Sequence, residues 1–360
     1  AAAVSGSMAL RALALAALSA GLSGCGTLGY YAQAIGGHAG VMGRMQPVEE
    51  VIRTTTDAGL KRKLQAAQEI REFASHELQL PDNNSYRTYA DLRRPYVVWN
   101  IVAVPEFSMQ PRQWCFAVVG CVAYRGYYEK SEARAFAEQL RADGFDVHVG
   151  GVRAYSTLGW FDDPLLNTML TPRRPYLAGV MFHELAHQQL YIDGDSAFNE
   201  AFATAVERAG VERWIAAKDD AELAARYQRM QMARQIFLRL ALAARERLIA
   251  LYDSELAADT KRAQKVAILA ETRAERATVM AEIGFPEAYA GFFDDGLNNA
   301  RLASIATYYD LVPAFEQLLR DQAGDLKRFY AAAQALGQQT PEERAAALAA
   351  LTGRAKQQHE

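Results

Sequence analysis

Two histidines and a glutamate in residues 182–203, FHELAHQQLYIDGDSAFNEAFA, have the types and spacing that bind a catalytic metal. In an α-helix, positions i and i+4 lie on one face, so His183 and His187 would present both imidazoles to one point. Neutral imidazole is a good ligand of Zn²⁺, and the His-Glu-x-x-His pattern on a helix is typical of zinc sites. The segment therefore predicts a helix that carries two ligands of a zinc ion.

A catalytic zinc needs a third protein ligand and one open position. The downstream candidates are Asp193, Asp195, Glu200 and Glu207. Both aspartates stand in a glycine-containing turn, where we expect them to serve as turn and cap residues. If the next helix packs antiparallel on the first, an early carboxylate of that helix returns to the histidines. Glu200 therefore fits better than Glu207, which lies two turns further along.

Glu184 follows the first histidine directly and belongs to a neighbouring face of the helix. We expect it to be a general base rather than a ligand, because it can take a proton from water and pass it to a leaving amine. Zinc lowers the pKa of a bound water toward 7 and polarises a carbonyl. Together these residues predict hydrolysis with a zinc cofactor.

The same residues carry a resemblance. HELAHQ followed by NEAFA resembles the gluzincin metallopeptidases, among them thermolysin and aminopeptidase N, in which a glutamate at the position of Glu200 is the third zinc ligand. Twelve residues separate His187 from Glu200. That spacing is shorter than in aminopeptidase N and places the chain outside that family proper.

The chain more closely resembles the predicted zinc aminopeptidases found as bacterial lipoproteins. This resemblance covers nearly the whole chain after the N-terminal signal sequence described below. The segments that carry it are QEIREFA, LPDNNSY, WCFAVVGCVAYRGYY, STLGWFDDPLLNTML, FHELAHQQLY and FNEAFA. The resemblance implies a peptide substrate and a zinc metallopeptidase, with aminopeptidase as the finer expectation. Two alternatives stay open: a peptide-binding lipoprotein that has lost catalysis, and a zinc amidase acting on cell-wall peptides.

Gluzincins bind the substrate backbone along an edge strand upstream of the metal helix, and RAYSTLGWFDDP is the segment expected to do so here. An unpaired strand edge binds an extended peptide by β-augmentation. Gly159 would allow close approach and Trp160 would line a side-chain pocket. Asp162 and Asp163 are candidates to bind a substrate α-ammonium group. The alternative is a structural strand with a buried Trp160.

A tetrahedral intermediate also needs a hydrogen-bond donor besides the metal, and gluzincins take a tyrosine or histidine from the helical half. In LNNARLASIATYYDLVPAF the candidates are Asn298, Asn299, Tyr308 and Tyr309. A helix would turn only one of the two tyrosines toward the cleft. Each of the four could equally be a packing residue.

The N-terminal residues predict export. Arg11 precedes a short apolar run, residues 12–20, that is too short to span a bilayer, which takes about 20 residues. Leu-Ser-Gly-Cys at residues 22–25 resembles a bacterial lipobox, which implies lipidation of Cys25, a membrane anchor and a periplasm-facing location. Gly26 favours the outer membrane. The alternative is an ordinary secretory signal with a chance cysteine.

Two further cysteines, Cys115 and Cys121, could form a disulfide in an oxidising compartment only if the chain turns between them, for example at Gly120. Two buried thiols on a strand are the alternative. The formal net charge is −3, so no broad basic surface is expected and nucleic-acid binding is disfavoured.

Periodicity predicts an α+β fold. A helix over residues 48–80 precedes strands over 96–107 and 114–128, and a helix begins after Ser131 as N-cap. We expect a small mixed or antiparallel sheet with the N-terminal helix, then a mostly α-helical half with the HExxH helix and a long helical hairpin over 223–251 and 256–280. The expected divisions are a signal peptide with lipobox (1–25), an N-terminal helix and β-rich subdomain with the substrate edge strand (44–175) and a helical subdomain with the zinc site and the helical hairpin (176–352).

Overall fold

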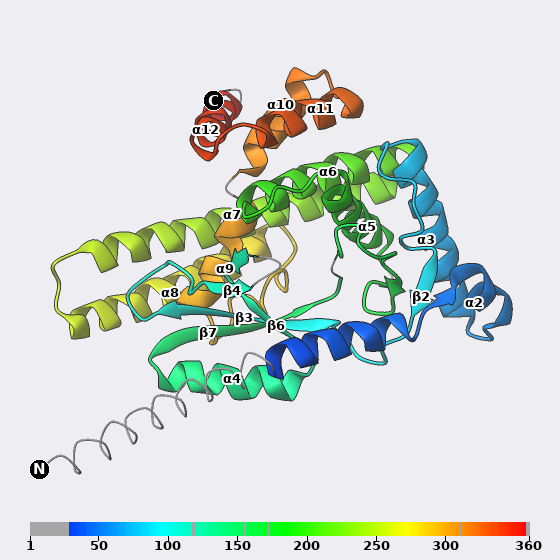
Figure 1. Cartoon of the computed structure of the whole chain (residues 1–360). Coiled ribbons are helices and arrows are strands. Elements are labelled where there is room, and N and C mark those ends of the chain that lie inside the picture. The colour runs from blue at the N-terminus through cyan, green and yellow to red at the C-terminus, as the bar shows by residue number, and fades with distance from the viewer. Residues whose placement is uncertain (1–28, 117–119, 155, 172, 310, 358–360) are drawn as a thin grey trace, which may run out of the picture.

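The computed structural model describes residues 29–116, 120–154, 156–171, 173–309 and 311–357, and it has the mixed α+β architecture predicted from the sequence (Figure 1). The strands are β1 (Gln46–Pro47), β2 (Thr88–Ala90), β3 (Val98–Pro105), β4 (Trp114–Phe116), β5 (Gly120–Val122), β6 (Arg125–Tyr127), β7 (Phe145–Val152) and β8 (Leu165–Leu166). The helices are α2 (Val48–Thr54), α3 (Ala58–His76), α4 (Lys130–Ala142), α5 (Arg174–Gln189), α6 (Ser196–Ala217), α7 (Ala221–Asp253), α8 (Ala258–Glu282), α9 (Asn299–Tyr309), α10 (Val312–Asp321), α11 (Leu326–Gly337) and α12 (Pro341–Gln357).

The antiparallel sheet β6-β3-β7 is covered on both faces. Side chains alternate along its central strand β3, so the two faces contribute to different cores. Trp99, Ile101 and Ala103 point into a core shared with α4. Val102 and Val104 point the other way, into a core shared with α7, α8 and α9. Figure 1 shows α4 beneath this sheet and the three helices above it. The other sheets are small: β1-β2-β8, which includes a parallel pair, and the hairpin β4-β5.

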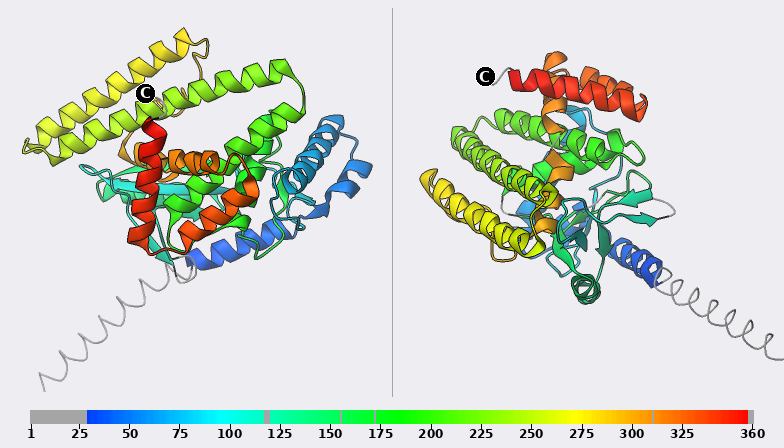
Figure 2. Two further views of the ribbon diagram at one scale, coloured as in Figure 1. Left: turned by 90° about the horizontal axis from the view of Figure 1, so that it is seen from above. Right: turned by 90° about the vertical axis from the view of Figure 1, so that its left-hand side faces the viewer.

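A third core joins α3 to the helix that carries both histidines, α5, and to α6. Phe182 of α5 and Phe202 of α6 are fully buried in it, together with Phe315 of α10 and Phe329 of α11. The helices α10, α11 and α12 pack over the outer side of α6 (Figure 2). The metal-binding sequence is therefore held on its buried side by helices from both ends of the chain.

The two longest helices, α7 and α8, lie side by side and are joined by the loop between residues 253 and 258 (Figure 2). Arg247 and Glu271 form an ion pair between them, 2.6 Å from nitrogen to oxygen. The end of α7 nearest the loop packs against α9 and the sheet, where Tyr252 donates a hydrogen bond to Asn299.

Two sequence predictions about helices were wrong in detail. The segment 48–80 forms two helices, α2 and α3, because Asp57 caps a new helix by accepting hydrogen bonds from the amides of Gly59 and Leu60. The N-cap of α4 is Glu129 rather than Ser131, and no side chain caps that helix.

Cys115 and Cys121 form a disulfide across the hairpin β4-β5, where they are directly opposite each other. Gly120 has a φ of +70°, a conformation that glycine adopts without strain. The disulfide alternative is therefore the one the structure adopts.

The described chain begins with a helix over residues 29–42. Cys25 and the predicted signal sequence lie outside the described residues. Across the residues that the structure does describe, none of the helices combines the length and the apolar character needed to cross a bilayer.

Candidate metal centre and active site

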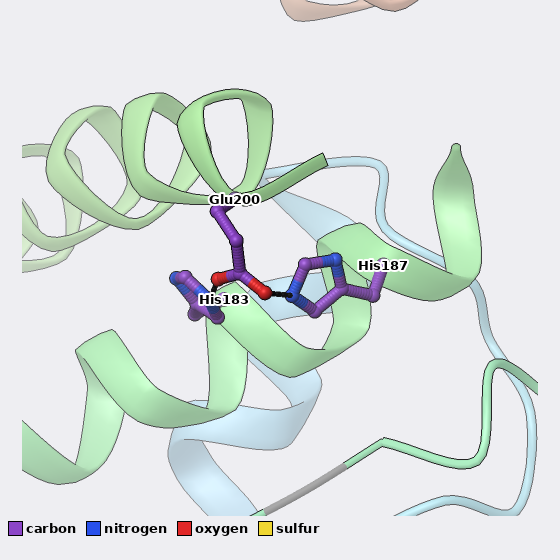
Figure 3. A group of neighbouring side chains, drawn as sticks. All are labelled: His183, His187 and Glu200. Atoms are coloured by element: carbon purple, nitrogen blue, oxygen red, sulfur yellow. Dashed lines mark hydrogen bonds and ion pairs between the residues drawn. The ribbon is translucent and has the colours of Figure 1, made fainter. Parts of the chain in front are cut away.

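His183, His187 and Glu200 form a group whose ligand atoms all lie within 4.8 Å of one another (Figure 3). The His183 Nε2 atom is 3.2 Å from one carboxylate oxygen of Glu200, and the His187 Nε2 atom is 3.8 Å from the other. The two Nε2 atoms and the carboxylate thus face one point. The expectation that a group able to bind a metal forms here is confirmed.

The group forms because α6 folds back antiparallel on α5. A short loop joins the helices, and Asn199 clamps it by exchanging hydrogen bonds of 2.8 Å with the backbone of Ile192. Asp195 accepts a hydrogen bond from the amide of Phe198 and is the N-cap of α6, as the sequence indicated. Arg344 of α12 contacts the other oxygen of Asp195 at 2.9 Å. The first turn of α6 is therefore held where Glu200 meets the histidines.

Glu207 lies two turns beyond Glu200 on the same face of α6 and contacts the back of His183. Its carboxylate is 3.2 Å from Nδ1 of that histidine, and Arg234 of α7 approaches its other oxygen at 3.4 Å. A carboxylate on the second ring nitrogen fixes the orientation of a metal-binding histidine. Sequence reasoning considered Glu207 only as a poorer ligand and missed this position, although the seven-residue spacing from Glu200 was a signal for it.

The charges of the group follow from these contacts. Burial opposes a proton on His183, but the two carboxylates that it contacts raise its pKa well above the usual value. Burial lowers the pKa of His187 to about 4, helped by the positive charge of His183. Although burial opposes ionisation of Glu207, the contacts with His183 and Arg234 lower its pKa to about 2. Without metal, the site therefore holds a protonated His183 between two carboxylates.

Glu184 follows His183 directly on α5 and is not a member of the metal group. Burial raises its pKa to about 7, and the nearby carboxylate of Glu200 also raises it. A carboxyl group with a pKa near the working pH exchanges protons readily and is suited to act as a general base.

A cavity of about 750 Å³ opens beside the group. Glu200 lines it together with Tyr191, which contacts the His187 ring, and Tyr124, which precedes β6. Burial raises the pKa of Tyr124 to about 12, and the carboxylates of Glu200 and Glu184 add to the shift. Tyr124 is therefore a neutral hydroxyl donor at neutral pH. The cavity continues over the face of β3 and β7 to α7 and α9, where its lining includes Asn100, Val102, His148, Arg245 and Ser304.

Residues 29–348 match the family described as "Putative aminopeptidase". The chain belongs to this family. Comparison of the chain with curated proteins and with solved structures gives no significant match. Membership agrees with the resemblance drawn from the HELAHQ and NEAFA segments and indicates peptidase activity.

In this member of the aminopeptidase family, the segment predicted to bind substrate as an edge strand does not form a strand. After β7 ends at Val152, residues 156–161 form a turn in which the amide of Trp160 donates to the carbonyl of Thr157. Leu158 and Gly159 both have positive φ, +57° and +83°, which no extended strand adopts. Trp160 is 81% exposed, so it is not a buried structural residue either. Periodicity could not reveal the positive φ values that end the strand.

The two aspartates after this turn have contacts of their own. Asp163 is 2% exposed, accepts hydrogen bonds from the amide of Thr157 and, at 3.1 Å, from Gln188 beside the second histidine. Its own amide donates to Ser85. Asp162 is exposed and accepts a hydrogen bond from Asn84 at 3.3 Å. Asp163 therefore fixes the turn and the LPDNNSY segment to the end of α5.

The sequence offered four candidates for the hydrogen-bond donor to a tetrahedral intermediate, and the structure describes the side chains of two of them. The side chains of Tyr308 and Tyr309 lie outside the described residues. Asn299 is fully buried and donates to the carbonyls of Glu106 and Ser108. Asn298 donates to the carbonyl of Val147 in β7. Both asparagines join α9 to the sheet, which is the packing role that the sequence left open for them.

Proposed function

We propose that this protein is a zinc-dependent metallopeptidase, and within that class an aminopeptidase. The observation that carries the proposal is the convergence of His183, His187 and Glu200 on one point beside the buried carboxyl group of Glu184. Family membership supports the peptidase class.

The residues present fit zinc. Two imidazole nitrogens and one carboxylate are a known ligand set of catalytic zinc in peptidases, and they leave one coordination position open. Both Nε2 atoms face the carboxylate, while Nδ1 of His183 contacts Glu207 on the far side. When bound, zinc would supply Lewis acidity to a substrate carbonyl and would acidify a bound water. Because His183 is protonated in the free site, its proton must leave before it can serve as a ligand, so metal affinity should rise with pH.

The chain's own residues would handle the proton and the developing charge. Glu184, whose carboxyl pKa is raised to about 7 by burial, would take the proton of the attacking water and give it to the leaving amine. Tyr124 would donate a hydrogen bond from its hydroxyl group to the oxyanion, since it stays neutral and lines the cavity near the carboxylates of Glu200 and Glu184. Tyr124 thus joins Tyr308 and Tyr309 as a candidate for this role.

Replacing Glu184 with Gln tests the proposal directly. The change keeps the shape of the side chain but removes its basicity, so the variant should bind one zinc and lose at least about 100-fold in kcat. Elemental analysis measures the metal, and hydrolysis of a peptide library measures turnover. Wild-type rates in a zinc-loaded Glu184→Gln variant would exclude this role for Glu184.

The aminopeptidase assignment needs its own experiment. An aminopeptidase requires the free α-ammonium group, so it should cleave a peptide and leave the matched N-acetylated peptide intact. Equal cleavage of both would make the enzyme an endopeptidase with the same metal site.

We further propose that Cys25 is lipidated and that the protein is anchored to a membrane facing the periplasm, the outer membrane being the expected one. The support is the short apolar run that ends in Leu-Ser-Gly-Cys. Membrane fractionation should find the wild-type protein in the membrane and a Cys25→Ala variant in the soluble or unprocessed fraction. Recovery of the wild-type protein from the cytosol would contradict the anchor.

A further inference from the structure

The cavity beside the metal group is lined by groups of opposite charge. Glu200 and the first turn of α6 contribute to its wall, and so do Arg245 of α7, Ser304 of α9 and His148 of β7. Its volume, about 750 Å³, is within the range of clefts that enclose a drug-sized ligand, which is also the size of a short peptide. One bound peptide could thus contact both Glu200 and Arg245.

Arg245 brings an uncompensated charge to this cavity. Among the described residues it has no ion-pair or hydrogen-bond partner, and its Nε atom is buried without one. Other arginines of the same region differ: Arg247 pairs with Glu271, and Arg301 pairs with Asp294. The Arg245 side chain is only partly buried, but its Nε–H is withdrawn from water without a partner, which is costly, and a bound anion would offset that cost.

His148 adds a second donor. Its Nδ1 atom accepts a hydrogen bond from Nε of Arg301 at 3.4 Å, which leaves the Nε2 atom of the neutral ring as an N–H donor. Burial and the charge of Arg301 lower the pKa of His148 to about 4, so the ring is neutral at pH 7.

The acidic side chains that line the cavity are both engaged elsewhere. Asp195 caps α6 and contacts Arg344, and Glu200 belongs to the metal group. None of the described lining residues therefore neutralises Arg245 within the cavity.

We propose that Arg245 binds the C-terminal carboxylate of a short peptide whose scissile bond lies beside Glu200 in the same cavity. The inference rests on the proposed peptidase function and names its substrate class, which is short peptides with a free C-terminus. A guanidinium binds a carboxylate through paired N–H···O bonds, and the buried wall around it strengthens the attraction.

The test uses one tripeptide in two forms, as the free acid and as the C-terminal amide. The wild-type enzyme should prefer the acid by about 10- to 100-fold in kcat/KM, the effect expected for a charge-assisted hydrogen bond. Arg245→Gln should lose that preference for the acid over the amide, while Arg245→Lys should keep part of it. Arg247→Gln, on the same helix but outside the cavity lining, is the control and should behave as wild type.

Binding to the zinc-loaded Glu184→Gln protein, measured by calorimetry, separates this inference from the proposed function. If the acid binds more tightly than the amide and Arg245→Gln in that background abolishes the difference, the carboxylate site stands whether or not the peptide is cleaved. If the enzyme cleaves peptides but treats acid and amide alike, the metallopeptidase stands and the carboxylate site is refuted. Equal losses on both substrates in Arg245→Gln would also refute it.

Discussion

Removing the carboxylate of Glu207 should weaken zinc binding without removing a ligand. Glu207 contacts Nδ1 of His183 at 3.2 Å, on the side of the ring away from the metal group. Its side chain is 24% exposed, so water can replace it only in part. Glu207→Gln keeps an acceptor oxygen but loses the charge, whereas Glu207→Ala loses both.

The expected magnitude follows from that contact. A hydrogen bond to a charged group contributes about 1.5–3 kcal/mol, and loss of such a partner typically weakens metal affinity by about 10- to 100-fold. We therefore expect the zinc Kd to rise by about 10-fold in Glu207→Gln and by about 100-fold in Glu207→Ala.

The proton on His183 works in the opposite direction. Glu207 helps to raise the pKa of that histidine, and the proton competes with the metal for the ring. Removing Glu207 lessens this competition at pH 7 but changes less at pH 9, where fewer molecules carry the proton. The loss of affinity should therefore be larger at pH 9 than at pH 7.

Competition with a chromophoric chelator at the two pH values measures the affinities. Glu212→Gln is the matched control, because Glu212 is exposed on the same helix. Glu200→Gln should lose more affinity than either Glu207 variant, because it removes a ligand. Unchanged zinc affinity in both Glu207 variants would refute the orienting role.

Two other predictions concern stability. His148 has a pKa of about 4 in the folded protein and about 6.5 when unfolded. Its contribution to the free energy of unfolding is therefore present above pH 6.5 and is lost as the pH falls toward 4. Urea unfolding of the wild type should show a loss of about 1–2 kcal/mol between pH 7 and pH 5 that His148→Gln lacks, and an identical pH dependence in the variant would contradict this. Gly210 of α6 leaves no room for a methyl group, because an added Cβ would lie 2.7 Å from Leu78 and 2.8 Å from Phe182. Gly210→Ala should lower the free energy of unfolding by about 1–3 kcal/mol despite alanine's better helix propensity, and a stabilised variant would show that the packing adjusts freely.

The sequence by itself determined the residues of the metal group. The four-residue spacing of His183 and His187 places them on one helix face, and the short loop before Glu200 limits where a returning helix can bring its first carboxylate. Local rules of this kind also predicted strand β3, the strand-rich segment that holds β4 to β6, the cap at Asp195 and the α+β class.

Only the tertiary structure decided what surrounds that group. The role of Glu207 depends on which side of His183 faces α6, and the place of Tyr124 depends on how the segment before β6 meets the cavity. The expected substrate strand became a turn because Leu158 and Gly159 take positive φ while Asp163 fixes the segment to Gln188. These outcomes depend on contacts between residues far apart in the chain, and the periodicity of a single segment carries no information about its distant partners.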